Sequence, residues 1–311
     1  ADGPPRPRNA GALDYAADAT VETVARDVFR DCFAQIAQNM VVVARTDAIE
    51  GPHQLRVGLR RLRTAFSIFG PTLGEAAVAP LSTAARDLGR LVGALRDLDV
   101  LIDEVVGGPA SAGLDQPARA ALVAALDARR EAARAEVRAA LAGPQGTGFA
   151  FDLLEFVEAR GWLAPSDYSQ TERLATPVSE LAPRLLGRRL RKALKLGRDI
   201  ESLDADALHA LRKELKKLRY TVETFAPIHK GKQFSAFLRS LKDMQDTFGS
   251  LNDASMAAEA LTGPGSPGRS DPDAQRAVGW TLGALEVKVG DDRPALFAHW
   301  AEFAGARPFW D

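Results

Sequence analysis

Several features that would point to common protein classes are missing from this sequence. A single cysteine, Cys32, excludes an intramolecular disulfide framework and is typical of a chain kept in a reducing compartment. No run of about 18 apolar residues exists, so we expect no membrane-spanning segment. Walker loops, Rossmann glycine patterns, nucleophile elbows and protein-kinase signatures are absent. Convincing strand alternation is absent too, which predicts an all-α fold.

Overall charge is also nearly absent. The 311 residues carry a formal net charge of −1, so the protein as a whole is not basic, and local concentrations of charge become informative. Hydrophobic residues make up 46%, enough for a substantial core. Cys32 lies in an apolar helical pattern, which predicts a buried small side chain and not a nucleophile.

What the sequence does contain is a basic pattern that occurs twice. The first copy reads His53-Gln54-Leu55-Arg56-Val57-Gly58-Leu59-Arg60-Arg61-Leu62-Arg63, and the second reads His209-Ala210-Leu211-Arg212-Lys213-Glu214-Leu215-Lys216-Lys217-Leu218-Arg219. If each copy is a helix, the histidine and three of its cations, one from each successive turn, lie on one face within an arc of roughly 80° around the helix axis. We call these sets the first ladder (His53, Arg56, Arg60, Arg63) and the second ladder (His209, Arg212, Lys216, Arg219). The leucines gather on a neighbouring arc and should face a core.

The repeat extends beyond the ladders. A shift of 156 positions places His209 on His53, Phe225 on Phe69 and Asp253 on Asp97. A register that stays constant over this distance indicates two copies of one unit. Each unit is predicted to be a four-helix bundle, and two bundles related by a pseudo-twofold axis would place the ladders around a basic central pore or groove.

Residues 181–198 hold a third basic set, here called the basic stripe. Its members also fall within roughly 80° on a helix, and no acid interrupts the segment: Arg184, Arg188, Arg191, Lys195 and Arg198. The matching positions of the first half carry no charge, because they are Val28, Cys32, Gln35, Asn39 and Val42. We therefore expect a basic surface that is stronger in the second half.

Periodicity, glycine and proline predict the division of the chain. Residues 1–19 form a Pro-rich linker or tail, 20–142 the first four-helix bundle, 143–176 a connecting segment with a loop over 161–171, and 177–311 the second bundle. Helices are expected over 20–45, 52–70, 73–106, 116–141, 149–160, 177–198, 205–226, 232–260, 273–289 and 293–304.

A charged helical stripe is usually a solvated face with i,i+4 ion pairs. This interpretation suits Arg119, Arg130, Arg134 and Arg138, because Asp127, Glu131 and Glu136 interleave with them. It suits the ladders and the basic stripe poorly, because Glu214 is the one acid in all three stretches. Cations crowded in this way favour an anionic partner. The neighbouring arginines should also disfavour protonation of His53 and His209, although metal ligation through both histidines stays an alternative.

These residues resemble the CHAD domain (conserved histidine α-helical domain) family. The resemblance covers residues 20–310 and rests on both ladders, with Gly93-Ala94-Leu95-Arg96-Asp97-Leu98-Asp99-Val100, Tyr220 and Leu251-Asn252-Asp253. It implies two four-helix bundles around a basic pore that binds inorganic polyphosphate, and association with polyphosphate granules in the bacterial cytoplasm. Family members are often fused to an N-terminal CYTH domain, but this chain lacks that domain's Glu-x-Glu-x-Lys pattern, so no hydrolase activity is carried over.

The resulting hypothesis is a non-enzymatic polyphosphate-binding module that needs no cofactor or metal. Both ladders and the basic stripe would hold the ligand, with Arg61, Lys213 and Lys217 as a second tier. A first alternative is a Mg²⁺-dependent phosphohydrolase or phosphotransferase that uses Asp97, Asp99 and Asp253, although orientation of the ladder arginines explains these carboxylates more simply. A second alternative is nucleic-acid binding, which usually adds aromatic stacking platforms; Phe66, Phe69 and Tyr220 are expected in the core instead.

Overall fold

The chain folds into helices, as the sequence predicts. The computed structural model describes residues 3–108, 111–164, 166–267, 269 and 271–310, and these include no β-strand. The helices are α1 (Val21–Arg45), α2 (Glu50–Leu73), α3 (Glu75–Val100), α4 (Gln116–Ala142), α5 (Pro144–Glu158), α6 (Tyr168–Ala175), α7 (Val178–Leu196), α8 (Ala205–Thr224), α9 (Lys232–Thr262) and α10 (Pro272–Gly305). A π-helical turn, Leu101–Val106, continues α3.

Side-chain caps define where several of these helices begin. Thr20 accepts a hydrogen bond from a backbone N–H of the first turn of α1, and Asp115, Asp204 and Asp271 do the same for α4, α8 and α10. Each cap satisfies a backbone donor that has no partner inside the helix. The local sequence therefore determines the spacing between helix starts.

The helix starts follow the spacing of the two ladders. Adding 156 to the first residues of α1, α2, α3 and α4 gives 177, 206, 231 and 272, and α7, α8, α9 and α10 begin at 178, 205, 232 and 272. The second half differs in one respect, because α4 and α5 are separate helices joined at Gly143, whereas α10 is one continuous helix.

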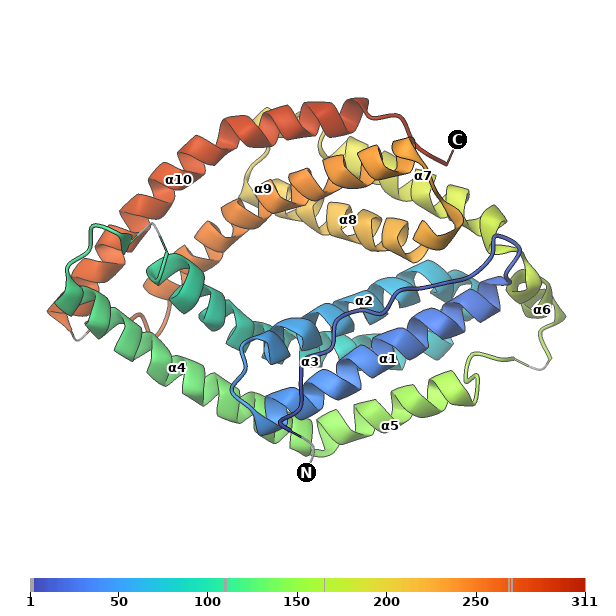
Figure 1. The fold of residues 1–311 in the computed structure, drawn as a ribbon, viewed down its shortest axis with the longest axis horizontal. Coiled ribbons are helices and arrows are strands. Elements are labelled where there is room, and N and C mark those ends of the chain that lie inside the picture. Colours follow the sequence, from blue (N-terminus) through green and yellow to red (C-terminus); the bar gives the residue numbers. More distant parts are fainter. Residues whose placement is uncertain (1–2, 109–110, 165, 268, 270, 311) are drawn as a thin grey trace.

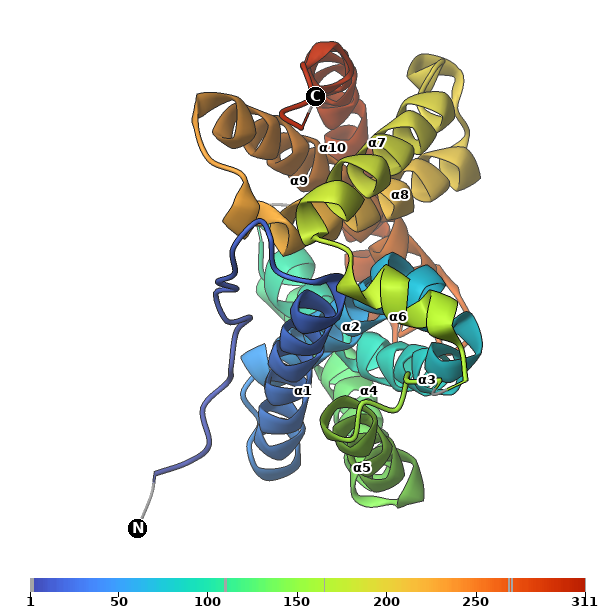
Figure 2. The ribbon, with the colours of Figure 1, turned by 90° about the vertical axis from the view of Figure 1, so that its right-hand side faces the viewer.

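The helices form two groups that meet at both ends of the molecule. Helix α2 packs between α1 and α3, helix α8 contacts α7 and α9, and α2 contacts α8 across the middle. At one end α4 packs along α10, where both helices converge, and at the other end α6 links the groups (Figure 1). The view along the long axis shows α7, α8 and α9 above α1, α2 and α3 (Figure 2). Helices α2 and α8 are in contact where the two groups meet.

Two reciprocal backbone hydrogen bonds join the starts of α1 and α7. The N–H of Val21 donates to the carbonyl oxygen of Thr176 at 2.9 Å, and the N–H of Val178 donates to that of Ala19 at 2.8 Å. Chain segments that begin equivalent helices of the two halves are thus paired directly with each other.

The apolar residues beside each ladder form the core between these helices, as expected. All are 3% exposed or less: Leu55, Leu59, Leu62 and Phe66 on α2, and Leu211, Leu215, Leu218 and Val222 on α8. The core continues from one group to the other, because the Phe69 ring meets the Phe225 ring edge-on, with centroids 6.5 Å apart. Cys32 is buried, as predicted.

Some predicted boundaries are wrong. The last two helices are one, because α10 continues through Pro294, and α2 continues through Pro71. A proline removes one helical hydrogen bond, but α10 has Leu285 in one core cluster and Leu296 in another, and this packing outweighs the loss. Helix α5 begins at Pro144, five residues before the predicted start at 149. Helix α6 begins at Tyr168, inside the segment 161–171 that was expected to be a loop.

The Pro-rich segment at the start of the chain lies against α1. The backbone N–H and carbonyl of Arg8 both bond the Asn39 side chain, at 3.2 and 2.8 Å, and the N–H of Gly11 donates to Asp31 at 2.8 Å. The Tyr15 hydroxyl donates to the carbonyl of Thr224, at the end of α8. Ala1, Asp2 and Asp311, the outer ends of the predicted segments 1–19 and 177–311, lie outside the described residues. No helix among the described residues combines the length and hydropathy that a bilayer crossing requires.

Candidate functional site

Two cavities of about 980 Å³ each lie beside α2 and α8. The first cavity is lined by His53, Arg61 and Arg219, together with Asn9 to Leu13 of the N-terminal segment. The second cavity is lined by Arg56, Arg63, His209, Lys213 and Lys217, together with residues of α3. Four residues line both cavities: Arg60, Arg212, Lys216 and Tyr220. The structure thus brings all members of both ladders, and the second tier, around one composite basic site.

The shared part of the site contains cations without a counter-charge. Arg60, Arg212 and Lys216 form no ion pair within the described residues, and the Nε atoms of Arg60 and Arg212 are buried there without a hydrogen-bond partner. The Arg60 guanidinium lies over the Tyr220 ring, 5.4 Å from its centroid, which gives a cation–π contact. Cations that are partly buried and unpaired are destabilising, so this arrangement suits a site that an anion completes.

Lys216 is the most strongly perturbed of these groups. Burial, together with the nearby Arg60, Arg212 and Arg56, lowers the pKa of Lys216 to about 6, although Asp253 acts in the opposite direction. Burial also lowers the pKa of Arg212. In the absence of an anion, part of the site's charge is therefore suppressed, and a bound anion would restore it.

Of the remaining ladder arginines, two have carboxylate partners, and the exposed Arg63 forms no ion pair within the described residues. Arg56 donates through Nη1 to Asp97 of α3, and Arg219 pairs with Glu223 at 2.6 Å. The equivalent of Asp97, Asp253, acts electrostatically on Arg212 without forming an ion pair. In the second tier, Arg61 bonds Asp31 and Gln35 at 2.8 and 2.7 Å, and Lys217 lies 3.6 Å from Glu214. The partnered groups surround the unpaired centre.

The histidines that open the ladders are the less perturbed part of the site. His53 is half-buried and lines the first cavity, while His209 is exposed and lines the second. The pKa of each is lowered, mainly by burial and further by a neighbouring cation, Arg96 for His53 and Lys213 for His209. The neighbouring cations lower both histidine pKa values, as the sequence predicts, but burial lowers them more.

Three residues of the second cavity were not predicted. Arg86 and Arg90 of α3 lie on its wall, and they help burial to lower the pKa of Arg63. Their i,i+4 spacing is visible in the sequence, and in the structure both lie near Asp87, at 3.5 and 3.8 Å. Tyr220 was expected in the core and instead lies at the centre of the site, whereas Phe66 and Phe69 are buried as predicted.

The basic stripe lies elsewhere. All five members are exposed on α7 or just after it, and none lines either cavity. The cations of α7 that do point inward are Arg189 and Lys192, which pair with the buried Glu214 of α8 at 3.1 Å each. The sequence correctly showed that the stripe shares one helix face, but the expectation that this face joins the ladders is wrong.

The three aspartates of the phosphotransfer alternative are used separately. Asp97 pairs with Arg56, as expected for an orienting carboxylate, and Asp253 is near Arg212. Asp99 is buried near Arg134 and Arg130, away from the ladders, and burial raises its pKa to about 6. The described residues contain no group of three or more histidine, cysteine or carboxylate side chains placed to hold a metal ion.

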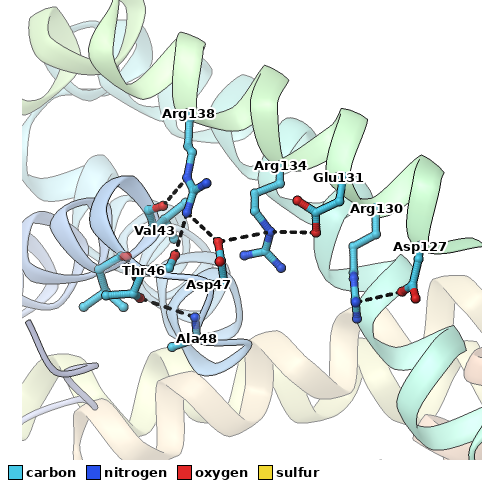
Figure 3. A network of polar contacts seen from close by, with 10 residues as sticks. Val43, Thr46, Asp47, Ala48, Asp127, Arg130, Glu131, Arg134 and Arg138 are labelled. Carbon is cyan, nitrogen blue, oxygen red and sulfur yellow. Dashed lines mark hydrogen bonds and ion pairs between the residues drawn. The ribbon is translucent and has the colours of Figure 1, made fainter. Parts of the chain in front are cut away.

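The interleaved acids pair with only two of the four α4 arginines, Arg130 and Arg134, while Arg119 donates to the carbonyl of Ser111 and has no acidic partner within the described residues. Arg130 pairs with Asp127 at 2.7 Å, while Arg138 donates to Asp47 and to backbone oxygens at the end of α1 (Figure 3). Arg134 departs from the prediction of an outer face, since it is 2% exposed and its Nε lies 3.6 Å from Glu131. Helix α4 packs against α3 and α10 as well as α1, and this covers Arg134.

Comparisons with known proteins agree with this geometry. Residues 27–262 match the family model described as CHAD domain. The fold is similar to the crystal structure of the CHAD domain from the plant Ricinus communis, with 26% identity, a TM-score of 0.81 and coverage of 97% of this chain and 98% of that one. It is also similar to PptA from Streptomyces chartreusis, with 15% identity, a TM-score of 0.59 and coverage of 91% and 100%. No curated protein matches the sequence. With most of its length matched by the family model, this chain belongs to the CHAD domain family.

Proposed function

We propose that this protein binds inorganic polyphosphate, without hydrolysing it, in a basic passage between α2 and α8. The CHAD family is associated with polyphosphate binding in general. The observation that carries the proposal is the unpaired group of Arg60, Arg212 and Lys216, which lines both cavities. A linear polyanion matches such a group because arginine can grip phosphate oxygens with two N–H bonds while lysine adds less directional charge.

The passage is supported by the way the two cavities meet. Both cavities include Arg60, Arg212, Lys216 and Tyr220 in their walls. A chain that enters the first cavity beside Arg219 could continue past this group into the second cavity beside Arg63. In this arrangement successive phosphates would meet a cation on either side, one from each ladder.

An internal pseudo-twofold repeat is part of the proposal. The matching helix starts, the reciprocal hydrogen bonds between the starts of α1 and α7, and the contact of Phe69 with Phe225 all support it. Under the shift of 156 positions, Arg60 corresponds to Lys216. Both lie in the shared wall, as two residues near such an axis would.

A binding role without catalysis is supported by the carboxylates. Asp97 is held by Arg56, and Asp99 is buried at a different place, so the three aspartates that phosphotransfer would need are not gathered. Association with cytoplasmic polyphosphate granules is the corresponding cellular proposal, and a fluorescent fusion that stays diffuse in granule-containing cells would contradict it.

Titration calorimetry with long-chain polyphosphate at low salt tests the function. Replacing Arg60 and Lys216 together by glutamine should weaken binding about 100-fold, because each charge-assisted hydrogen bond contributes roughly 1.5 kcal/mol or more. The matched control replaces Arg26 and Arg30, which pair with Glu158 on the surface of α1, and should bind as the wild type does. Unchanged affinity in the first variant would refute the proposed site, and displacement of polyphosphate by single-stranded nucleic acid would favour the nucleic-acid alternative.

A further inference from the structure

The basic stripe is a strongly charged surface that the proposed passage does not use. Its members repeat along α7 at intervals of three or four residues, so their side chains stand above one another on the helix. From Arg184 to Lys195 the helix rises roughly 16 Å, at 1.5 Å per residue. None of the five cations forms an ion pair within the described residues.

Two other cations of the same helix show how this protein neutralises cations when they have a structural role. Arg189 and Lys192 are paired with Glu214, an acid that is 2% exposed and is supplied by α8 for this contact. Arg189 also donates to the Ser67 hydroxyl of α2. The inward cations of α7 therefore hold helices together, whereas the outward cations hold nothing in the protein.

The two halves of the protein differ in the exposure of this helix face, as the corresponding positions of α1 show. The five positions that match the stripe are Val28, Cys32, Gln35, Asn39 and Val42, and all of them are buried. Two arginines of α1, Arg26 and Arg30, pair with Glu158, while the exposed Arg45 at the end of the helix forms no ion pair within the described residues. The first half thus covers this helix face and neutralises two cations beside it, while the second half exposes the face and leaves five cations without acids.

We propose that this face of α7 is a second polyphosphate-binding surface, separate from the two cavities, so that one protein molecule holds two segments of polyanion at once. A flexible linear polyanion fits because the stripe follows one face of the helix, is one cation wide and is exposed along its whole length. The inference rests on the proposed function for the identity of the ligand. The inference adds a second binding site, so that each protein molecule would bind polyphosphate at two places.

Counting sites with a short polyphosphate of defined length tests the proposal. The stripe variant replaces Arg188, Arg191 and Lys195 by glutamine, and its control replaces Arg26, Arg30 and Arg45 of α1, which removes the same charge. The cavity variant is Arg60→Gln with Lys216→Gln. We expect two sites per molecule in the wild type and the control, and one in each of the other two variants. Every replaced stripe residue is exposed and unpaired, and circular dichroism verifies the fold.

Long-chain polyphosphate provides a second readout. A polyphosphate molecule long enough to reach both surfaces binds the second one at a high local concentration, which raises its overall affinity. The stripe variant should therefore bind long polyphosphate at least tenfold more weakly than the wild type does. Its affinity for short polyphosphate at the cavities should be unchanged. The dependence of log affinity on log salt should also become shallower by about 2 when three cations are removed.

The outcomes separate this inference from the proposed function. Two sites in the stripe variant, or no binding at all by the cavity variant, would overturn the second surface while leaving the passage in place. Loss of binding in the stripe variant together with unchanged binding in the cavity variant would remove the passage and leave the surface. Tighter binding of anionic vesicles or duplex DNA than of polyphosphate by the cavity variant would assign the stripe to a different partner and overturn the proposal.

Discussion

At the scale of single residues, the cations of the ladders differ in what surrounds them. Arg56 and Arg219 have carboxylate partners, whereas Arg60, Arg212 and Lys216 have none within the described residues. The unpaired three therefore have the most to gain from a ligand. The histidines that begin each ladder, although conspicuous in the sequence, have lowered pKa values and are largely neutral at physiological pH.

Proton uptake should accompany polyphosphate binding. The pKa of Lys216 is about 6 in the unliganded protein, so at pH 8 its amine is mostly neutral, and a phosphate beside it favours the charged form. Binding enthalpies measured at pH 8 in buffers of different ionisation enthalpy should therefore reveal uptake of up to one proton. Lys216→Met should abolish this uptake, and heats that do not depend on the buffer would show that Lys216 does not bind the anion.

The variant Asp97→Asn distinguishes binding from catalysis. It removes a negative charge from the wall of the second cavity and releases Arg56 from its partner. We expect polyphosphate to bind a few-fold more tightly, since charges a few ångströms apart near a protein surface interact by about 1 kcal/mol or more. Calorimetry at constant salt measures this change. Weaker binding, or loss of a phosphate-releasing activity, would instead support a role for Asp97 in holding Mg²⁺.

At the scale of helices, α7 and α8 are tied by a buried acid. Glu214 accepts from Arg189 and Lys192, each at 3.1 Å, and lies 3.6 Å from Lys217. These cations hold the pKa of Glu214 below its usual range, although burial acts against them. The contact stabilises the fold at every pH above the usual pKa of glutamate and is lost as the pH falls below the lowered value.

Glu214→Gln should lower the free energy of unfolding by about 2 kcal/mol at pH 7, because it leaves Arg189 without its acid in a nearly buried position. The value is smaller than for a fully buried pair because Lys192 and Lys217 are about half exposed. Urea denaturation measures the difference. The gap between variant and wild type should narrow below pH 4, and a gap that persists there would indicate a packing effect and not a charge effect.

The helices and their inner faces could be predicted from the sequence, but their neighbours could not. Periodicity correctly assigned Leu59 and Leu215 to the core, and the constant register anticipated the matching helix starts. Periodicity gives a side chain's direction on its own helix and says nothing of which helix covers it. For this reason Arg134 is unexpectedly buried, Tyr220 faces the ladders, and the basic stripe points away from them.

At the scale of the whole molecule, a net charge of −1 hides a strong separation of charge. The cations of the basic site repel one another when the site is empty, so they lower the stability of the unliganded fold. We expect Lys216→Met to raise the thermal unfolding temperature of the unliganded protein. Polyphosphate should raise this temperature more for the wild type than for the variant, because a ligand that binds only the folded state stabilises it in proportion to its affinity.

Differential scanning calorimetry at pH 7 with and without polyphosphate measures both effects. Salt should act in the same direction on the unliganded wild type, since screening weakens the repulsion between Arg60 and Arg212 and their effect on Lys216. A lower unfolding temperature for Lys216→Met would mean that the lysine's contacts matter more than its charge.

The two groups of helices are joined at both ends, by α4 with α10 at one and by the paired starts of α1 and α7 at the other (Figure 1). A frame closed in this way holds α2 and α8 at a set separation, with Phe69 against Phe225 as an internal stop. We therefore expect the proposed passage to sort ligands by thickness, so that it accepts a single strand of linked phosphates and excludes a rigid double helix.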